Sequence, residues 1–263
     1  MTDKKKQSDC SIKYLTTVDS TNLYAKRNYE SLQNKTLIVA EQQTAGKGRL
    51  DRTWLSPVNE NIYASFVVKR PNFPIYMATW ICGLATLQTL REFTEDTSLP
   101  LWLKWPNDVY CSYKKISGIL CEGVLDNKNQ IDGIIIGVGI NINSSSEFLS
   151  QLDQAATSLK IETAHDEAYD LKIIAEKLAV NFEKYFNVAE SSTELLYQLW
   201  RNENKLINQR ISIISPNNEC LEGIVKDINE NGEIVFEIDD KEQIILCGDI
   251  KIQKETIKNL QFS

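Results

Sequence analysis

The sequence predicts an α+β protein: a mixed, largely antiparallel sheet with helices on one side, followed by a small β-barrel. Two observations predict the sheet, namely short runs of β-branched and aromatic residues and the turn residues that join them in place of long crossovers. A third predicts the barrel, because beyond Asn204 the runs become short and closely spaced, and Asn231-Gly232 is typical of a tight hairpin.

The first unit follows residues 1–11, which include three consecutive lysines and predict a disordered tail. The strands expected from apolar, β-branched runs are Ile12–Val18, Thr36–Ala40, Asn61–Val68, Leu101–Trp105, Val109–Cys111, Ile116–Leu125 and Ile134–Gly139. The expected helices are one that begins at Asp19-Ser20-Thr21-Asn22, then Ile75–Thr94, Asp170–Tyr185 and Glu194–Asn202. Apolar residues on nearly every face of Ile75–Thr94 indicate a buried helix, whereas Asp170–Tyr185 has a single apolar stripe.

The second unit should contain the strands Arg210–Ile214, Glu219–Ile228, Glu233–Ile238 and Gln243–Cys247. We therefore expect a first domain at residues 12–203 and a small barrel at residues 204–255.

Length and composition exclude several classes of protein. The 263 residues, 42% hydrophobic and 25% charged, suffice for one large core and a small second domain. A net charge of −7 argues against general affinity for DNA or anionic membranes, and the absence of a long apolar run or signal peptide predicts a cytoplasmic protein. Six scattered cysteines without a CxxC pair and the single histidine, His165, argue against disulfides, zinc and Ser-His or Cys-His catalysis.

A cationic loop at Ala40–Trp54 (AEQQTAGKGRLDRTW) is the first candidate for chemistry. Two glycines flank Lys47, Arg49 and Arg52 add two more cations, and Trp54 supplies a flat aromatic face. These residue types suit a phosphate joined to a planar base. A solvated surface loop is the alternative, and the GxxxxGK[ST] spacing of a Walker loop is absent.

A second candidate stretch is Leu103–Glu122 (LKWPNDVYCSYKKISGILCE). Its polar residues Lys104, Asn107, Asp108 and Lys115 fall at strand ends and turns, where a rigid sheet commonly presents its functional groups. Upstream lies Ser20-Thr21-Asn22, which alone would be read as a helix cap, and downstream lies Gly137-Val138-Gly139-Ile140-Asn141.

These four motifs, in this order, resemble those of the biotin protein ligases, closely over Tyr14–Leu159 and loosely beyond. The resemblance implies a class II synthetase-like catalytic domain with an SH3-like carboxy-terminal domain. It implies the monofunctional form, since about 19 residues before the Ser-Thr-Asn motif are too few for a DNA-binding domain. The implied activity is ATP-dependent formation of biotinyl-5′-AMP, with Mg²⁺, and transfer of biotin to a lysine of a biotin carboxyl carrier protein, such as that of acetyl-CoA carboxylase. The implied protein binds no DNA and is a monomer or weak homodimer.

The resemblance also implies roles for individual residues. The biotin-binding set would be Ser20, Thr21, Asn22, Gln43, Lys47, Gly48, Arg49 and Lys115. The nucleotide-binding set would be Arg49, Trp54, Asn107 and Asn141, and the catalytic set Lys115, Arg49 and Asp108. Asp108 would accept a proton or hold the metal, and the sequence does not choose between these tasks.

The chain departs from the family pattern at Lys47, where arginine is commoner, and at Asp51, where glycine is frequent. Lysine keeps the charge but loses bidentate phosphate geometry. Two alternatives stay open. One is a lipoate ligase or octanoyltransferase of the same architecture, and the other is a non-catalytic sensor of biotin or its adenylate.

Overall fold

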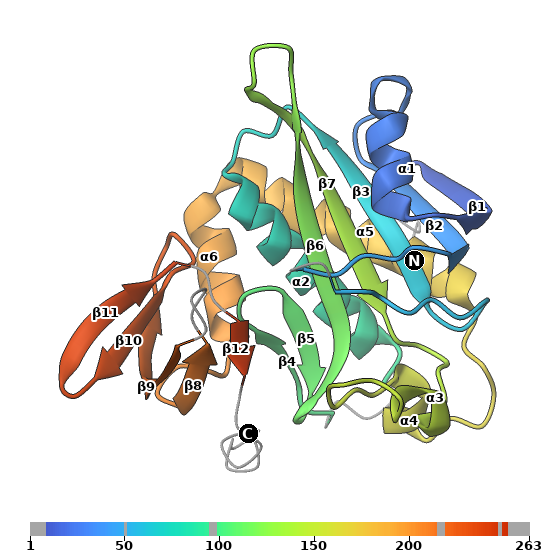
Figure 1. Ribbon diagram of the computed structural model, residues 1–263. Coiled ribbons are helices and arrows are strands. Elements are labelled where there is room, and N and C mark those ends of the chain that lie inside the picture. Colours follow the sequence, from blue (N-terminus) through green and yellow to red (C-terminus); the bar gives the residue numbers. More distant parts are fainter. Residues whose placement is uncertain (1–8, 50–51, 95–98, 215–218, 247–248, 252–263) are drawn as a thin grey trace, which may run out of the picture.

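The structure is a computed structural model that describes residues 9–49, 52–94, 99–214, 219–246 and 249–251. Its largest element is a seven-stranded sheet in the order β1-β2-β3-β7-β6-β5-β4 (Figure 1). The strands are β1 (Ile12–Val18), β2 (Thr36–Gln43), β3 (Ile62–Lys69), β4 (Leu101–Lys104), β5 (Asp108–Cys111), β6 (Lys114–Leu125) and β7 (Ile131–Ile140). Only β1 and β2 pair in parallel, so the predicted mixed, largely antiparallel sheet is confirmed.

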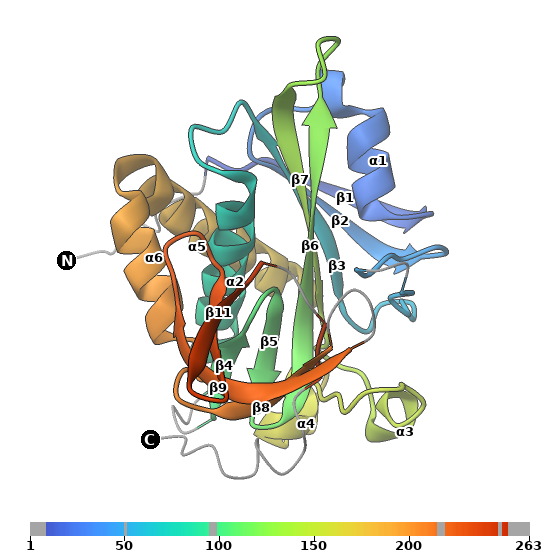
Figure 2. The ribbon, with the colours of Figure 1, turned by 60° about the vertical axis from the view of Figure 1, so that its left-hand side comes forward.

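Three helices cover one face of this sheet: α2 (Ile75–Glu92), α5 (Leu171–Ser191) and α6 (Thr193–Asn202) (Figure 2). α2 is buried along most of its length, as its apolar residues on every face predict, and α5 packs along it. Phe182 of α5 stacks on Phe66 of β3 with ring centroids 3.7 Å apart. Trp200 of α6 stacks on Trp80 of α2 at 4.7 Å, so aromatic contacts join α5 to the sheet and α6 to α2.

The prediction that helices lie on one side is wrong for α1 (Thr21–Arg27), which packs on the opposite face. Successive residues of a strand point to opposite faces, and Leu37 and Val39 of β2 join the main core whereas Ile38 joins a second cluster. That second cluster contains Ala25 of α1 and Tyr29 of a short 3₁₀ turn, Tyr29–Ser31. α1 is only 7 residues long and offers too short an apolar pattern to reveal its face. Two short helices, α3 (Ser146–Leu149) and α4 (Leu159–Thr163), were not predicted.

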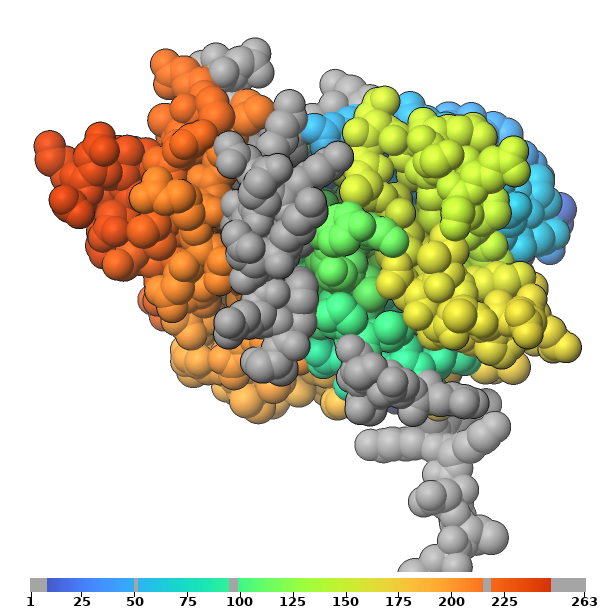
Figure 3. Space-filling view, turned by 90° about the horizontal axis from the view of Figure 1, so that it is seen from below, coloured from blue at the N-terminus to red at the C-terminus, as the bar shows by residue number. Residues whose placement is uncertain are grey.

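The carboxy-terminal residues form a second, antiparallel sheet that stands beside the main body as a separate lobe, orange to red in Figure 3. Its strands are β8 (Arg210–Ile214), β9 (Cys220–Ile228), β10 (Ile234–Ile238), β11 (Lys241–Ile245) and β12 (Asp249–Lys251), in the order β11-β10-β9-β8-β12. β12 was not predicted, and the expected end at Cys247 lies outside the described residues. The pairings run in one series from β11 to β12, so closure into a barrel stays a prediction.

The two sheets share one core. Ile213, Val225 and Phe236 belong to the same hydrophobic cluster as α2, and Trp105 Nε1 donates to the Gly232 carbonyl at 2.7 Å. The second sheet is therefore packed against the turn that follows β4. Within the described ranges, none of the helices is both long and apolar enough to cross a bilayer.

We predict that Phe182→Ala lowers the free energy of unfolding by about 3–5 kcal/mol, because it removes a fully buried ring and leaves a cavity against Phe66. Phe148→Ala, in the half-buried α3, should cost at most about 1 kcal/mol. Urea unfolding of both variants measures the difference. Equal losses would show that the stacked pair does not hold α5 on the sheet.

Candidate active site

One cleft collects the polar residues that the sequence singles out. It encloses about 820 Å³, including space open to solvent, and it lies between the start of α1, the end of β2, the loop before β3 and the β6–β7 hairpin. Every predicted site residue except Asn141 lines it: Ser20, Thr21, Asn22, Gln43, Lys47, Gly48, Arg49, Trp54, Asn107, Asp108 and Lys115. A cleft of this size with convergent polar groups is the usual form of a small-molecule site, and the roles of these residues stay predictions.

Hydroxyl and amide groups from α1, β2 and β3 form the floor of the cleft. Thr21 donates its backbone N–H to Gln43 Oε1 at 2.9 Å, and the Thr21 hydroxyl lies 3.1 Å from the same oxygen. Ser20 is the N-cap residue of α1, but its side chain makes no capping hydrogen bond. Capping, the alternative reading of Ser20-Thr21, therefore does not account for the Ser20 hydroxyl.

A charged pair stands behind this floor. Asn22 Nδ2 donates to Glu122 Oε2 at 2.7 Å, and Lys26 Nζ lies 2.5 Å from Glu122 Oε1. Burial raises the pKa of the Glu122 carboxyl, but the hydrogen bonds from Lys26 and Asn22 and the charges of Lys26 and Lys47 outweigh burial and hold it below its usual range. Glu122 is thus a carboxylate at neutral pH.

The cationic loop folds back on itself over the cleft. Trp54 N–H donates to the Gly46 carbonyl at 2.9 Å, and Gly48 N–H donates to the Arg52 carbonyl at 2.7 Å. Gly46 is required there, because a Cβ on it would overlap the Trp54 carbonyl oxygen. Arg49 Nη1 reaches across to Asn107 Oδ1 at 2.8 Å and joins the loop to the turn after β4. Asp51 lies outside the described residues.

The indole of Trp54 lies flat against the β6–β7 hairpin. A Cβ at Gly139 would overlap the indole, and one at Gly118 would come within 3.1 Å of it. Lys115 Nζ lies 5.5 Å from the ring centroid. Two glycines therefore make room for an aromatic platform beside a cation, an arrangement suited to a base joined to a phosphate.

Lys115 and Asp108 form the best-buried ion pair of the cleft. Lys115 Nζ lies 2.7 Å from Asp108 Oδ1, and the two side chains are 14% and 12% exposed. The separation is that of an ion pair, although the angles at Asp108 Oδ1 are poor for a hydrogen bond. The lysine can therefore turn toward another anion without losing a well-formed hydrogen bond.

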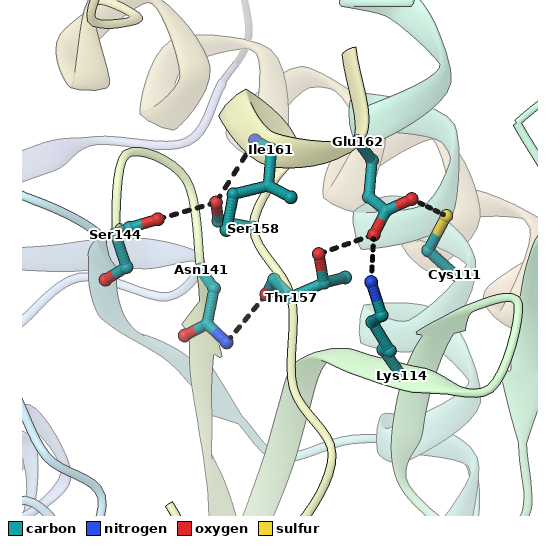
Figure 4. Close-up of polar contacts among 8 residues, drawn as sticks. All are labelled: Cys111, Lys114, Asn141, Ser144, Thr157, Ser158, Ile161 and Glu162. Atoms are coloured by element: carbon teal, nitrogen blue, oxygen red, sulfur yellow. Dashed lines mark hydrogen bonds and ion pairs between the residues drawn. The ribbon is translucent and has the colours of Figure 1, made fainter. Parts of the chain in front are cut away.

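The backbone of Lys115 is held from behind by the segment before α4. Lys115 N–H donates to the Ala155 carbonyl at 3.0 Å, and Thr157 N–H donates to the Lys115 carbonyl at 2.9 Å. Glu162 accepts from the Thr157 hydroxyl at 2.6 Å and pairs with Lys114 at 3.4 Å (Figure 4). These contacts fix the position of the Lys115 backbone, from which its side chain extends.

Asn141 belongs to this supporting cluster and not to the cleft lining. Its Nδ2 donates to the Thr157 carbonyl at 3.0 Å, and the residue is 6% exposed (Figure 4). The nucleotide contact expected of Asn141 stays a prediction, and this hydrogen bond uses one of its amide donors to hold the chain behind Lys115.

The sequence analysis missed several residues at the site. Ser65, fully buried, lies 2.7 Å from Thr21 Oγ1 and 2.6 Å from Asn22 Oδ1. A lone serine within the apolar run Ile62–Val68 was the available signal. Glu122 ended the second motif but was read only as part of a strand. The cleft lining also includes Arg52, Gly137 and Gly139, which the motifs named without assigning a role, and Thr53, Gly118 and Gln154.

Asp108 was also the weak candidate for a metal ligand. In the part of the chain that the structure describes, no three side chains of the metal-binding types gather into a cluster. Asp108 is the one carboxylate among the described residues that line the cleft. This set does not form a metal cage, but it fits an ion held mainly by nucleotide phosphates and water, as Mg²⁺ commonly is.

We predict that Gly139→Ala undocks Trp54 and leaves the sheet intact, because alanine fits an extended strand and only the indole must move. Hydrogen exchange of the segment around Trp54 should quicken about tenfold, the effect of losing ~1.4 kcal/mol of local stability. Gly123→Ala is the matched control, since its Cβ would meet Ile75 at an ordinary 3.5 Å. Unchanged exchange in Gly139→Ala would mean that the indole is not docked there.

Comparisons with known proteins agree with this geometry. A model of the biotin/lipoate A/B protein ligase family matches residues 14–141. The chain is 33% identical over 152 residues to the bifunctional ligase/repressor BirA of Bacillus subtilis, a match that covers 57% of this chain and 46% of that protein. It is 28% identical over 218 residues to the biotin–[acetyl-CoA-carboxylase] ligase of Mycobacterium tuberculosis, covering 81% of this chain and 77% of that protein.

A solved structure matches over nearly its whole length. The biotin protein ligase from Aquifex aeolicus, in complex with biotin and ATP, superposes with a TM-score of 0.78 at 28% identity, covering 92% of this chain and 98% of that one. The match to the Bacillus ligase/repressors, in contrast, spans about half their length, 46%. The four ordered motifs, the family model that matches residues 14–141 and the shared fold make this chain similar to the biotin protein ligases.

Proposed function

We propose that this protein activates biotin with ATP and transfers it to a lysine of a biotin carboxyl carrier protein. The observation that carries the proposal is that three kinds of group line one cleft. They are the hydroxyl and amide groups of the floor, the cations Lys47, Arg49 and Lys115, and the Trp54 indole. The floor suits a polar ring, the cations suit a carboxylate and a phosphate, and the indole suits a base. The Aquifex relative that shares the fold binds biotin and ATP.

In the first half-reaction, the biotin carboxylate attacks the α-phosphorus of ATP, an acyl–phosphate bond forms, and pyrophosphate leaves. Lys115 turns from Asp108 to lie between the carboxylate and the α-phosphate, where it offsets the charge that builds up on both. Lys47 and Arg49 face the phosphates from the loop, and Arg49 is held by Asn107. Trp54 supports the adenine.

In the second half-reaction, the amine of a carrier lysine attacks the acyl carbon, an amide forms, AMP leaves and the amine loses a proton. Asp108 has two tasks compatible with its position: to accept that proton, or to hold Mg²⁺ with the nucleotide phosphates. Magnesium would supply charge neutralisation of the leaving pyrophosphate. The loop excludes water from the activated intermediate.

The proposed carrier is the biotin carboxyl carrier of acetyl-CoA carboxylase, because the name of the Mycobacterium relative gives acetyl-CoA carboxylase as its substrate. We assign catalysis to residues 12–203, since every described residue that lines the cleft lies there. We assign residues 204–255 to the second domain, and its described part packs behind the turn that contains Asn107 and leads into Asp108.

Ligand identity separates this proposal from a lipoate or octanoyl enzyme of the same family. We predict biotin-dependent exchange of pyrophosphate into ATP and none with lipoate, because an acyl chain would leave the buried hydroxyl and amide groups of the floor unpaired. Lipoate-dependent exchange of similar size would overturn the assignment. Binding of biotin without exchange would instead indicate a non-catalytic sensor.

Lys115→Met should lower the rate of adenylate formation by about 10²–10³, the cost of one placed transition-state charge contact. Lys128→Met, the same change on the exposed β6–β7 turn, should leave the rate within about twofold. Rapid-quench measurement of adenylate, with a thermal unfolding check, tests both. A folded Lys115→Met protein with near-normal adenylate formation would remove Lys115 from this role.

A further inference from the structure

We propose that Glu162, which does not line the cleft, is a positioning residue for Lys115. It holds the segment before α4 against a β-bulge in β6, and this bulge aims Lys115 into the cleft. The proposal rests on the proposed function, in which Lys115 takes part in adenylate formation. It adds a distant carboxylate that decides where the charge of that lysine is placed.

Strand β6 contains one residue more than its partner β5 within their pairing. Val109 pairs with Ser117, whereas Tyr110 pairs with Lys115. Ile116 is therefore an extra residue on β6, which makes this irregularity a β-bulge. A bulge bends its strand and re-aims the neighbouring side chains, and it disrupts the hydrogen-bond ladder at that point.

The bulge brings Lys115 to the face of the sheet that lines the cleft. In a regular strand alternate residues share a face, so Gly118 would share its face with Lys114 and not with Lys115. The Lys115 side chain nevertheless lies over Gly118, because its Nζ would be 3.0 Å from a Cβ at that glycine. Ile116 points the other way, into the main core. The extra residue therefore selects Lys115 from two consecutive lysines as the cation of the cleft.

Backbone groups at the bulge hydrogen-bond to segments that follow β7. Lys115 N–H donates to the Ala155 carbonyl at 3.0 Å, and the Lys115 carbonyl accepts from Thr157 N–H at 2.9 Å. The Ile116 carbonyl accepts from Asn141 N–H at 2.9 Å. Buried backbone groups that lose their partners are costly, so the bulge depends on the segment before α4 staying in place.

Glu162 ties that segment to α4 (Figure 4). Its Oε1 accepts from the Thr157 hydroxyl at 2.6 Å and lies 3.4 Å from Lys114 Nζ, so the second lysine is paired outside the cleft. α4 is itself anchored, because the Ser158 hydroxyl at its N-cap donates to the Ser144 carbonyl at 2.8 Å. The carboxylate therefore connects an anchored helix to the strand segment that pairs with the bulge.

Loss of Glu162 should lower kcat and leave substrate affinity little changed. Among the described residues, its hydrogen-bond and ion-pair partners are Thr157, Lys114 and Cys111, and none of these lines the cleft. The floor and the indole therefore keep their own contacts. A shifted Lys115 backbone, in contrast, misplaces a transition-state charge, and a misplacement of about 1 Å can cost roughly 10²-fold in rate.

Rapid-quench measurement of adenylate tests this role in Glu162→Ala and Glu162→Gln, each alone and combined with Lys115→Met. Glu162→Ala should lower kcat about 10- to 100-fold, with KM for biotin and ATP within about threefold. Glu162→Gln should stay within about threefold of the wild-type rate, because a glutamine oxygen still accepts from the Thr157 hydroxyl. In the Lys115→Met background, Glu162→Ala should change the rate by about twofold or less, because the side chain through which it acts is absent.

Amide hydrogen exchange tests the bulge without catalysis. In Glu162→Ala the amides of Lys115 and Asn141, which donate at the bulge, should exchange about tenfold faster. The amides that join β3 to β7 should keep their wild-type rates. Glu167→Ala is the matched control at an exposed position beyond α4, and it should leave both exchange and kcat within about twofold.

Three results would each overturn the inference. They are a loss in the Lys115→Met background equal to that in the wild type, a loss in Glu162→Gln as large as in Glu162→Ala, and unchanged exchange of the Lys115 amide in Glu162→Ala. A wild-type protein that forms no adenylate would overturn the proposed function and with it the catalytic part of the inference. Amide exchange would then decide by itself whether Glu162 holds the bulge.

Discussion

The site depends on glycines in the β6–β7 hairpin, because they let Asn22 and Trp54 approach the strand backbone closely. Side chains at Gly137 and Gly139 would overlap Asn22 and Trp54, so both elements sit directly on the strand backbone. The hairpin is otherwise strongly apolar and lies at the centre of the sheet. Because the hairpin pairs with strands on both sides, it gives the start of α1 and the loop before β3 a common, well-supported surface to pack on.

Cations gather in the cleft although the protein as a whole is acidic. Lys47, Arg49, Arg52 and Lys115 line the cleft in a protein whose net charge is −7, so the positive field is local and suits small anions more than nucleic acid. Glu122, beside the floor, is balanced by Lys26 and by the charge of Lys47.

Support for the site comes from parts of the chain that never reach the cleft. The Glu162 cluster holds the segment that pairs with the backbone of Lys115 (Figure 4). The second sheet packs behind the turn that precedes Asp108, through Trp105 and Gly232. Such contacts explain why polar groups at the ends of short strands keep fixed positions. Buried hydrogen bonds whose partners are all satisfied make a single arrangement much more stable than its alternatives.

The sequence by itself determined the strands, the long helices and the residue types of the site, because these follow from periodicity, turn residues and local motifs. The strand expected at Thr36–Ala40 before a Gly-Lys-Gly loop, for example, needed no tertiary information, and β2 (Thr36–Gln43) contains it. Only the tertiary structure decided the face of α1 and the hydrogen bonds of Asn141, Ser65 and Glu122. Each of these depends on contacts between residues far apart in the chain, and the direction of a hydrogen bond is set by the partner at the far end, which no local pattern encodes.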